Sequence, residues 1–350
     1  MVTPTSDDEK IDTEFKMPSV EKAPPIPGLH FRYPHGEGDA GGLFRVHEQC
    51  SDRDHTDWLS SIEHLPTQTD LAHWLSKAIQ TGKGSNWLIA QIGEEIVGYS
   101  RVSWWTETEG TWVYLTVGWV VPAWRGMGIG TAMLHWAETR IQEMASEHPT
   151  HGQWEYASNA TNTEIDATDL LRNNGYYAAY TVLDMELTDF SQVPEPILPA
   201  GFELRPLTPQ HYRTVWDSIY ASYAKGRYAE DPTEERFRAY FEASGHDPAL
   251  WQVAWDSKNK EVAGQVLCKI ERGRGEVYEV SVRPEWRRRG LARGLLAFGL
   301  RALQQRGVTT VRLHTVSEFP TQAKNLYGSV GFHVRKAFPR YRKPRASSSV

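Results

Sequence analysis

The chain contains one pattern twice, in Val120-Val121-Pro122-Ala123-Trp124-Arg125-Gly126-Met127-Gly128-Ile129-Gly130 and in Val282-Arg283-Pro284-Glu285-Trp286-Arg287-Arg288-Arg289-Gly290-Leu291-Ala292. Each copy follows a β-branched apolar run and precedes a helical pattern. Arg125 and Arg287 lie 162 positions apart (287 − 125), which is too long for a solenoid repeat and predicts two copies of one domain. Glycines let such a loop turn tightly with converging N–H groups, and the next helix adds its positive dipole end. Each copy therefore predicts an anion-binding loop.

Length and composition are those of a globular protein with two domains. The 350 residues are 40% hydrophobic and 23% charged, with a net charge of −6, which argues against a protein that coats nucleic acid. The two cysteines, Cys50 and Cys268, argue against a disulfide framework. We see no apolar run of transmembrane length and no metal-ligand spacing among the 13 histidines. We therefore expect a cytoplasmic protein with no membrane partner, no nucleic-acid partner and no metal.

Composition divides the chain into five parts. Residues 1–27 are polar and then proline-rich, as in a disordered arm, and residues 345–350 form a loose tail. Residues 28–187 and 201–344 each read as strand, helices, hairpin, strand, glycine-rich loop, helix, strand, helix and strand. Residues 188–200 contain three prolines and are the best linker candidate. The pattern predicts an α/β fold in which each half has a mixed, mostly antiparallel central sheet flanked by helices.

Periodicity places the finer elements. Apolar residues at helical spacing predict a helical region over 53–82 and a helix from about 130 to 144. Alternation predicts a strand over 276–282, directly before the second glycine-rich loop.

The chain resembles the GNAT superfamily of acyl-CoA N-acyltransferases over 28–187 and 199–344. The motifs that carry the resemblance are Arg-x-x-Gly-x-Gly/Ala after Val-x-Pro, which occurs twice, and Ala323-x-x-x-Tyr327-x-x-x-Gly331-Phe332. The chain is thus similar to a tandem of two GNAT domains. The resemblance implies acetyl-CoA as cosubstrate and a small-molecule amine as acceptor. We expect a monomer, whose two domains form a pseudo-dimer, or a homodimer.

The resemblance also implies where coenzyme A binds. Backbone N–H groups of both loops would hold the pyrophosphate, and the pantetheine arm would pair with a strand that splays from its neighbour. An oriented strand N–H there can stabilise the developing oxyanion. The implied residues are Val280, Ser281, Val282, Arg287, Arg288, Arg289, Gly290, Leu291, Ala292 and Arg293 in the second half, and Val120, Val121, Arg125, Gly126, Met127, Gly128, Ile129 and Gly130 in the first.

Two carboxylates of the second half are candidates for the general base. A primary amine has a pKa of about 10.4 and must lose a proton before it attacks a thioester. Glu276, six residues before Val282 (282 − 276), stands where glutamate is a recurrent base in the family. Glu279 lies on the same strand with opposite parity, and a β-bulge, common in the family, could exchange their roles. A solvated or ion-paired carboxylate is the structural alternative.

The candidate acid is Tyr327, which matches the family tyrosine that can protonate the departing thiolate. An aromatic anchor between helix and sheet is the structural alternative for this residue. In the first half, Tyr114 stands six residues before Val120 (120 − 114) and Leu171 four before Gly175 (175 − 171). Neither the carboxylate nor the tyrosine is therefore present there. We predict that the second half is catalytic and that the first half is a silent copy with a complete loop.

The sequence leaves three functions open. The first is acetylation of a primary amine on an unidentified small molecule. The second follows from mycothiol synthase, a tandem GNAT family in which a lysine on one strand precedes Glu-Val-Tyr on the next, a pattern that resembles Lys269 and Glu276-Val277-Tyr278; it implies acetylation of a cysteinyl pseudo-disaccharide. The third is a coenzyme A-binding scaffold without turnover. Tyr223 and Tyr228 lie where the family often walls its acceptor pocket, although aromatic core packing is the alternative for them, and a solvated strand residue the alternative for Lys269.

Overall fold

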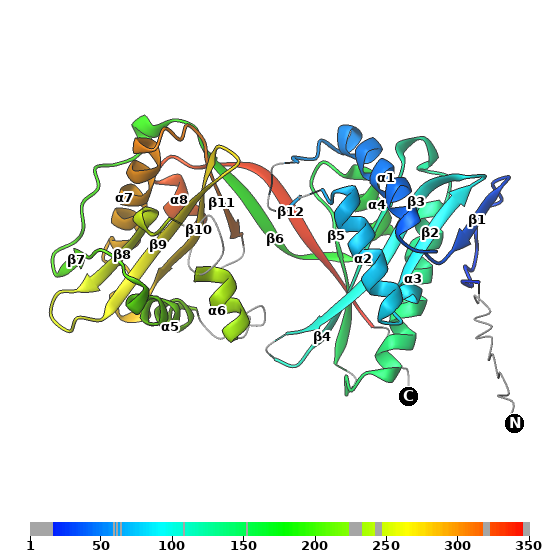
Figure 1. Cartoon of the computed structure of the whole chain (residues 1–350), viewed down its shortest axis with the longest axis horizontal. Helices are drawn as coiled ribbons and strands as arrows, with labels where there is room; N and C mark the ends of the chain where they lie inside the picture. Colours follow the sequence, from blue (N-terminus) through cyan, green and yellow to red (C-terminus); the bar gives the residue numbers. More distant parts are fainter. Residues whose placement is uncertain are drawn as a thin grey trace, which may run out of the picture. The chain divides into compact units, whose positions relative to one another are not determined.

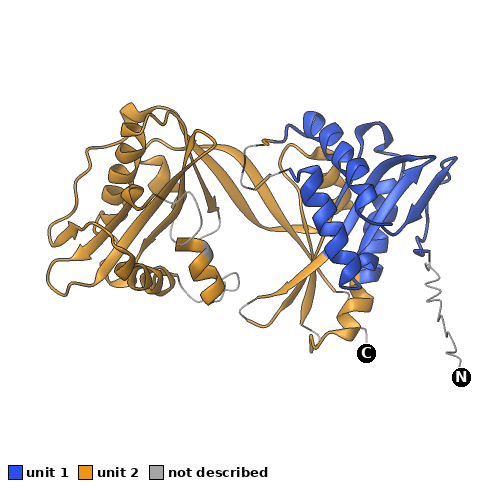
Figure 2. Cartoon of the chain, viewed as in Figure 1, with its two compact units in different colours: residues 1–56, 64–102, 118–140 blue, residues 57–63, 103–117, 141–350 orange. Residues whose placement is uncertain are grey.

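The computed structural model describes residues 17–58, 60, 62–63, 65–107, 109–151, 153–223, 233–241, 247–317 and 323–345. Tyr228, one of the predicted acceptor residues, lies outside these ranges. The chain forms two compact units (Figure 2). The first comprises residues 1–56, 64–102 and 118–140, and the second comprises residues 57–63, 103–117 and 141–350.

The first half of the sequence follows the predicted order of elements (Figure 1). It contains β1 (Leu29–Arg32), α1 (Ala40–Asp54), α2 (Gln68–Gln80), β2 (Trp87–Ile92), β3 (Glu95–Thr106), β4 (Trp112–Val120), α3 (Ile129–Glu147), β5 (Trp154–Asn159), α4 (Ile165–Asn173) and β6 (Tyr177–Leu187). The helical region predicted over 53–82 was wrong in its first part. The helix α2 begins only after Thr67, whose hydroxyl accepts from the Asp70 N–H in a capping box.

The second half repeats this order. It contains β7 (Phe202–Leu204), α5 (Tyr212–Ser222), α6 (Glu234–Phe241), β8 (Trp251–Asp256), β9 (Val262–Glu271), β10 (Arg274–Val282), α7 (Leu291–Gln305), β11 (Val311–Val316), α8 (Ala323–Gly328) and β12 (His333–Pro344). The Val-x-Pro part of each loop forms the same short 3₁₀ turn, over Pro122–Trp124 and Pro284–Trp286. The repeated pattern therefore folds in the same way in both copies.

The strands form a mixed sheet in the order β1-β2-β3-β4-β5-β12-β6-β11-β10-β9-β8-β7. The pairs β4–β5 and β10–β11 are parallel, whereas β12 is antiparallel to both β5 and β6. The last strand of the chain thus lies between two strands of the first half. The prediction of an α/β fold with a mixed sheet and flanking helices is confirmed.

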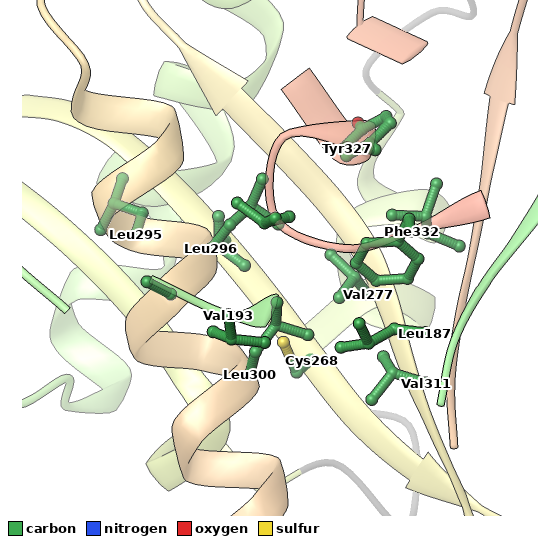
Figure 3. Packing of buried hydrophobic residues seen from close by; sticks show 14 of the residues in the cluster. Leu187, Val193, Cys268, Val277, Leu295, Leu296, Leu300, Val311, Tyr327 and Phe332 are labelled. Carbon is green, nitrogen blue, oxygen red and sulfur yellow. The ribbon is translucent and has the colours of Figure 1, made fainter. Parts of the chain in front are cut away.

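Helices cover both faces of the sheet in the second half. On one face, α7 packs Leu295, Leu296 and Leu300 against Val277 and Cys268 (Figure 3). On the other face, α5 and α6 pack an aromatic cluster against β8 and β9. Burial of each large apolar side chain contributes roughly 1.5–3 kcal/mol. Because alternate residues of β10 point to opposite faces, the face of each residue decides which helices it meets.

Candidate functional site

The two glycine-rich loops have the same backbone conformation. The left-handed region holds Gly126 (φ 73°) and Gly128 (φ 91°) in the first loop, and Arg288 (φ 57°) and Gly290 (φ 83°) in the second. These positions correspond at the repeat distance of 162 (288 − 126 and 290 − 128). Turns of this kind gather backbone N–H groups into a concave anion site. Both loops are therefore shaped for a phosphate group, and Arg288 takes up a conformation that favours glycine.

The first arginine of each loop braces the backbone. Arg125 Nε donates to the carbonyl of Val120 at 2.8 Å, and its terminal nitrogens bind both carboxylate oxygens of Asp54 at 2.7 Å. Arg287 Nε donates to the carbonyl of Val282 at 2.9 Å, and its Nη2 donates to the carbonyl of Ser222. Each guanidinium therefore ties its loop to the end of a helix, α1 or α5.

The exposed charges of the two loops differ. Three further arginines of the second loop and the first turn of α7 are exposed, whereas the corresponding positions of the first loop carry no charge. These arginines are Arg288, Arg289 and Arg293, at the positions of Gly126, Met127 and Thr131. An exposed guanidinium can bind phosphate oxygens bidentately. The second loop is thus the more strongly cationic of the two.

The strand before each loop parts from its parallel neighbour. The β10–β11 ladder contains only the pairs Gly275–Val311 and Glu276–Arg312, although β10 continues to Val282. In the first half, the β4–β5 ladder ends at Thr116, before β4 itself ends. The splay that the resemblance implies is therefore present, and it begins directly after Glu276. An open strand edge can pair with the amides of an extended ligand.

A glycine on the neighbouring hairpin strand permits close packing at the end of each loop strand. A Cβ on Gly264 would lie 2.8 Å from the carbonyl oxygen of Ser281, and a Cβ on Gly98 would lie 2.7 Å from that of Trp119. The two glycines are 166 positions apart (264 − 98). Sequence reasoning missed them, although their matching places in the two hairpins were a signal.

A β-bulge brings the two candidate carboxylates to one face of the sheet. The register of β10 against β9 shifts between Val277 and Glu279, so Tyr278 is the additional residue. Val277 packs toward α7, whereas Tyr278 packs against the aromatic cluster of α5 and α6. Glu279 also lies on the α5–α6 side, where it binds Tyr240. By alternation from Val277, Glu276 faces this side too.

Glu276 forms an ion pair with Lys269, which was predicted to contribute to the binding site of the amine substrate. The ammonium lies 3.1 Å from the Glu276 carboxylate and 2.8 Å from that of Glu271. Burial works to lower the pKa of Lys269, but the hydrogen bond to Glu271 and the charge of Glu276 raise it above its usual value. The Glu276 side chain remains 18% exposed. The structure thus joins a partly accessible carboxylate to a charged lysine.

Glu279 is buried and hydrogen-bonded to hydroxyl groups. The Tyr223 hydroxyl donates to its two oxygens at 2.9 and 3.0 Å, and the Tyr240 hydroxyl donates at 3.0 Å. Burial raises the pKa of Glu279, although hydrogen bonds from Ser281 and both tyrosines act in the opposite direction. Burial and the carboxylate also raise the pKa of both phenols well above the usual value. Tyr240 did not appear among the sequence candidates, because its contact with β10 depends on the placement of α6.

Tyr327 lies on α8 within the apolar cluster (Figure 3). Its ring meets Phe332 edge-on, with 6.3 Å between centroids. Burial first, and then the charge of Glu279, raise the pKa of Tyr327, and Tyr327 in turn influences Tyr223. The candidate acid is therefore within electrostatic range of Glu279 and Tyr223.

The corresponding face of the first half is filled by rings. The His47 ring contacts the Tyr99 hydroxyl at 2.5 Å and lies 4.5 Å from the Trp119 ring, centroid to centroid. Burial and the nearby Arg101 lower the pKa of His47 to about 4, so the imidazole is neutral at pH 7. Tyr99 and Trp119 are the counterparts of Gln265 and Ser281 at the close-packed glycines.

Tyr114, the counterpart of Glu276, is also engaged in packing. Its hydroxyl is 2.8 Å from Nδ1 of His148, which follows α3, and burial raises its pKa to about 12. Leu171, the counterpart of the candidate acid, is buried. Neither residue supplies a proton-transfer group that titrates near neutral pH.

Two loops of this shape, each beside a splayed parallel strand pair, define a tandem acyltransferase fold. The chain belongs to the acetyltransferase (GNAT) family, whose model matches residues 49–150 and 216–332. The family uses acetyl-CoA as cosubstrate. In the part of the chain that the structure describes, no helix is long and apolar enough to cross a bilayer, and no group of three or more His, Cys, Asp or Glu side chains is arranged to hold a metal ion.

Individual relatives support the tandem arrangement. Mycothiol acetyltransferase from Pseudarthrobacter chlorophenolicus is 28% identical over 221 residues, which cover 61% of this chain and 65% of that relative. The GCN5-related N-acetyltransferase of Sphaerobacter thermophilus has a TM-score of 0.70 at 24% identity and covers 91% of this chain and 96% of its own. A tandem GNAT protein from the clavulanic acid biosynthesis pathway has a TM-score of 0.56 at 15% identity, over 92% and 100%. The expected likeness to tandem GNAT proteins and to mycothiol synthase is confirmed.

Proposed function

We propose that the protein transfers the acetyl group of acetyl-CoA to a primary amine of a small molecule and that the second half performs the chemistry. The observation that carries this proposal is the position of Glu276. It is the last β10 residue paired with β11, and the bulge at Tyr278 places Glu279 on the same face. A base therefore stands where the open strand edge begins, whereas the first half has Tyr114 at this position.

The cosubstrate fits the second half better than the first. Among the described residues, the ladder between β10 and β11 does not continue beyond Glu276, so this strand edge can offer main-chain groups to the pantetheine amides. The following loop and the start of α7 offer N–H groups and three exposed arginines to the phosphates. The first loop has the same backbone conformation without these cations, so we expect it to bind coenzyme A more weakly.

Glu276 is the general base in this proposal. The Glu276 carboxylate is ion-paired with Lys269 and remains partly accessible. Glu276 takes a proton from the ammonium group, directly or through one water, and the neutral amine nitrogen then attacks the thioester carbon to form the C–N bond. The oxygens of Glu279, by contrast, already accept hydrogen bonds from Tyr223 and Tyr240.

The C–S bond breaks as the tetrahedral intermediate collapses. Its oxyanion can be stabilised by a main-chain N–H of the open β10 edge. A phenol is protonated at neutral pH, and burial raises the pKa of Tyr327 further. Its hydroxyl can donate a hydrogen bond to the departing sulfur and assist the release of coenzyme A.

A cysteinyl pseudo-disaccharide is the second candidate acceptor. The contact of 3.1 Å between Lys269 and Glu276 joins the lysine and glutamate of the pattern that resembles mycothiol synthase. A relative with 28% identity is a mycothiol acetyltransferase, which supports this acceptor class.

The experiment is a thiol-release assay with acetyl-CoA and a panel of amines. The panel contains polyamines, aminoglycosides, amino acids and a cysteinyl pseudo-disaccharide. We expect release with at least one amine and a product heavier by one acetyl group. Binding of coenzyme A, measured by calorimetry, without release for any amine would instead indicate a scaffold.

A further inference from the structure

The amide of Gln265 is the one polar side chain that interrupts the buried part of β9. The other residues from Val262 to Cys268 are apolar or glycine, and Gln265 is 0% exposed. Burial of an amide without hydrogen bonds is unfavourable in proteins. Packing alone would therefore favour an apolar residue at this position.

Both ends of the Gln265 amide are hydrogen-bonded. Ser218 Oγ donates to Oε1 at 3.2 Å, and Nε2 donates to Ser281 Oγ at 2.5 Å. Because the Ser281 oxygen accepts from the amide, its own O–H remains free to donate. Hydrogen bonding from Ser281 acts to lower the pKa of Glu279, which lies two residues earlier on the same face of β10.

Glu279 collects donors from three elements. Ser281 lies on β10, Tyr223 directly follows α5, and Tyr240 lies on α6. The chain of hydrogen bonds thus runs from the middle of α5 through Gln265 to the carboxylate and on to both phenols. Networks of this kind fix side-chain positions when every member is satisfied.

We propose that Gln265 is a positioning residue for the acceptor side of the site. Through Ser281 it fixes the Glu279 carboxyl group, which holds the phenols of Tyr223 and Tyr240 on the sheet face that carries Glu276. This inference rests on the proposed function of the second half. The first half lacks the network, since Tyr99, Trp119 and Val117 occupy the places of Gln265, Ser281 and Glu279.

The test is Gln265→Leu, which keeps the approximate size of the side chain and removes the amide. We expect kcat/KM for the amine to fall roughly 10- to 100-fold, because small displacements of groups that position a substrate have effects of that order. The KM for acetyl-CoA should stay within about twofold, because the loop and the open strand edge do not depend on this network. Tyr99→Phe, at the matching place in the first half, is the control and should leave both parameters unchanged.

A double substitution separates positioning from a general effect on folding. In a Glu279→Gln background, Gln265→Leu should lower kcat/KM by less than a further factor of about two, because both changes break the same chain. Equal losses in both backgrounds, or an equal rise in KM for both substrates, would overturn the inference. If Gln265→Leu does not fold, Ser218→Ala removes the other hydrogen-bond partner of the amide and is measured in the same way. If Glu276→Gln loses activity and Gln265→Leu has no effect, the positioning role of Gln265 is rejected and the proposed function stands. If Glu276→Gln stays active, the proposed function is rejected.

Discussion

Glu276 and Glu279 lie three residues apart (279 − 276) on one strand, yet their surroundings give them different chemistry. Glu276 is ion-paired with Lys269 and partly accessible. Glu279 is 7% exposed and surrounded by hydroxyl donors. Partial accessibility suits a group that exchanges protons with a substrate. Burial and multiple hydrogen bonds suit a group that holds other side chains in place.

Glu279→Gln should stabilise the folded protein at neutral pH. Burial raises the pKa of Glu279 above the usual 4.5, so the folded state binds a proton more tightly than the unfolded state does. The contribution of Glu279 to the free energy of unfolding is present at low pH. It is lost as pH rises from the usual pKa through the raised pKa of the folded state, by at most about 1.4 kcal/mol per pH unit. The advantage of the variant should therefore grow between pH 4 and pH 7. Urea midpoints at several pH values measure it, and a constant difference would contradict the prediction.

The substitution Tyr327→Phe tests whether the Tyr327 hydroxyl acts as the general acid. The substitution removes one hydroxyl from a buried ring and leaves the packing against Phe332. If the hydroxyl assists thiolate departure, kcat should fall by about 10²-fold with little change in the melting temperature. The thiol-release rate at saturating substrate is the measurement. A large loss of stability with unchanged kcat would make Tyr327 a packing residue.

The candidate site was predictable where it depends on spacing and unpredictable where it depends on tertiary packing. Glu276, Lys269 and Tyr327 were expected from the family resemblance, because each stands at the matching position of a motif along the chain. Tyr240 and Gln265 do not, because their role arises only when α5, α6 and β9 come together. The bulge at Tyr278 was considered, but its position depends on strand pairing that the sequence does not specify.

At the scale of elements, the β9–β10 pair is the part of the fold that positions the site. Its bulge sets the face of the carboxylates, and its close approach at Gly264 sets the open end of β10. The periodic helix α3 and the strand over 276–282 were predicted closely. The helix α1 was missed, because it begins with Ala-Gly-Gly and carries many polar residues, so propensity and periodicity both gave a weak signal.

Gly264→Ala should disturb the end of β10. The new Cβ would lie 2.8 Å from the Ser281 carbonyl oxygen and 2.9 Å from Val282 Cγ2, so the two backbones must move apart. Overpacking of this kind costs roughly 1–3 kcal/mol. We also expect KM for acetyl-CoA to rise, because the displaced strand is the proposed partner of pantetheine. Gly98→Ala is the matched variant and should lower stability without a change in KM; a rise in KM for Gly98→Ala alone would contradict this account.

At the scale of the whole molecule, the two halves share a fold and differ in their polar residues. Each half has the same loop conformation, 3₁₀ turn and strand splay. At the matching positions, all within the described residues, the second half alone has the carboxylates, the exposed arginines and the buried hydrogen-bond network. The domain limits 28–187 and 201–344 stay a prediction, because β12, at the end of the second half, pairs with β5 and β6 of the first half.

Arg342 should be important for the attachment of β12. Its Nη2 lies 3.3 Å from Glu107, and both side chains are 2% exposed. Arg342→Met should destabilise the fold by about 3–5 kcal/mol, because the substitution removes one partner of a buried ion pair. Adding Glu107→Leu should recover much of that loss. Denaturant unfolding of the single and double variants checks both statements, and a neutral Arg342→Met would contradict them.

The central claim is that chemistry takes place in the second half, and one comparison tests it most directly. The measurement is the rate of thiol release from acetyl-CoA with the best amine of the panel, for Glu276→Gln and for Tyr114→Phe at the matching position of the first half. We predict that Glu276→Gln lowers kcat by about 10²- to 10⁴-fold, the usual contribution of a general base, and that Tyr114→Phe stays within about twofold of the parent protein, because its hydroxyl serves packing rather than proton transfer. Retained turnover in Glu276→Gln, together with loss in Tyr114→Phe, would contradict the account.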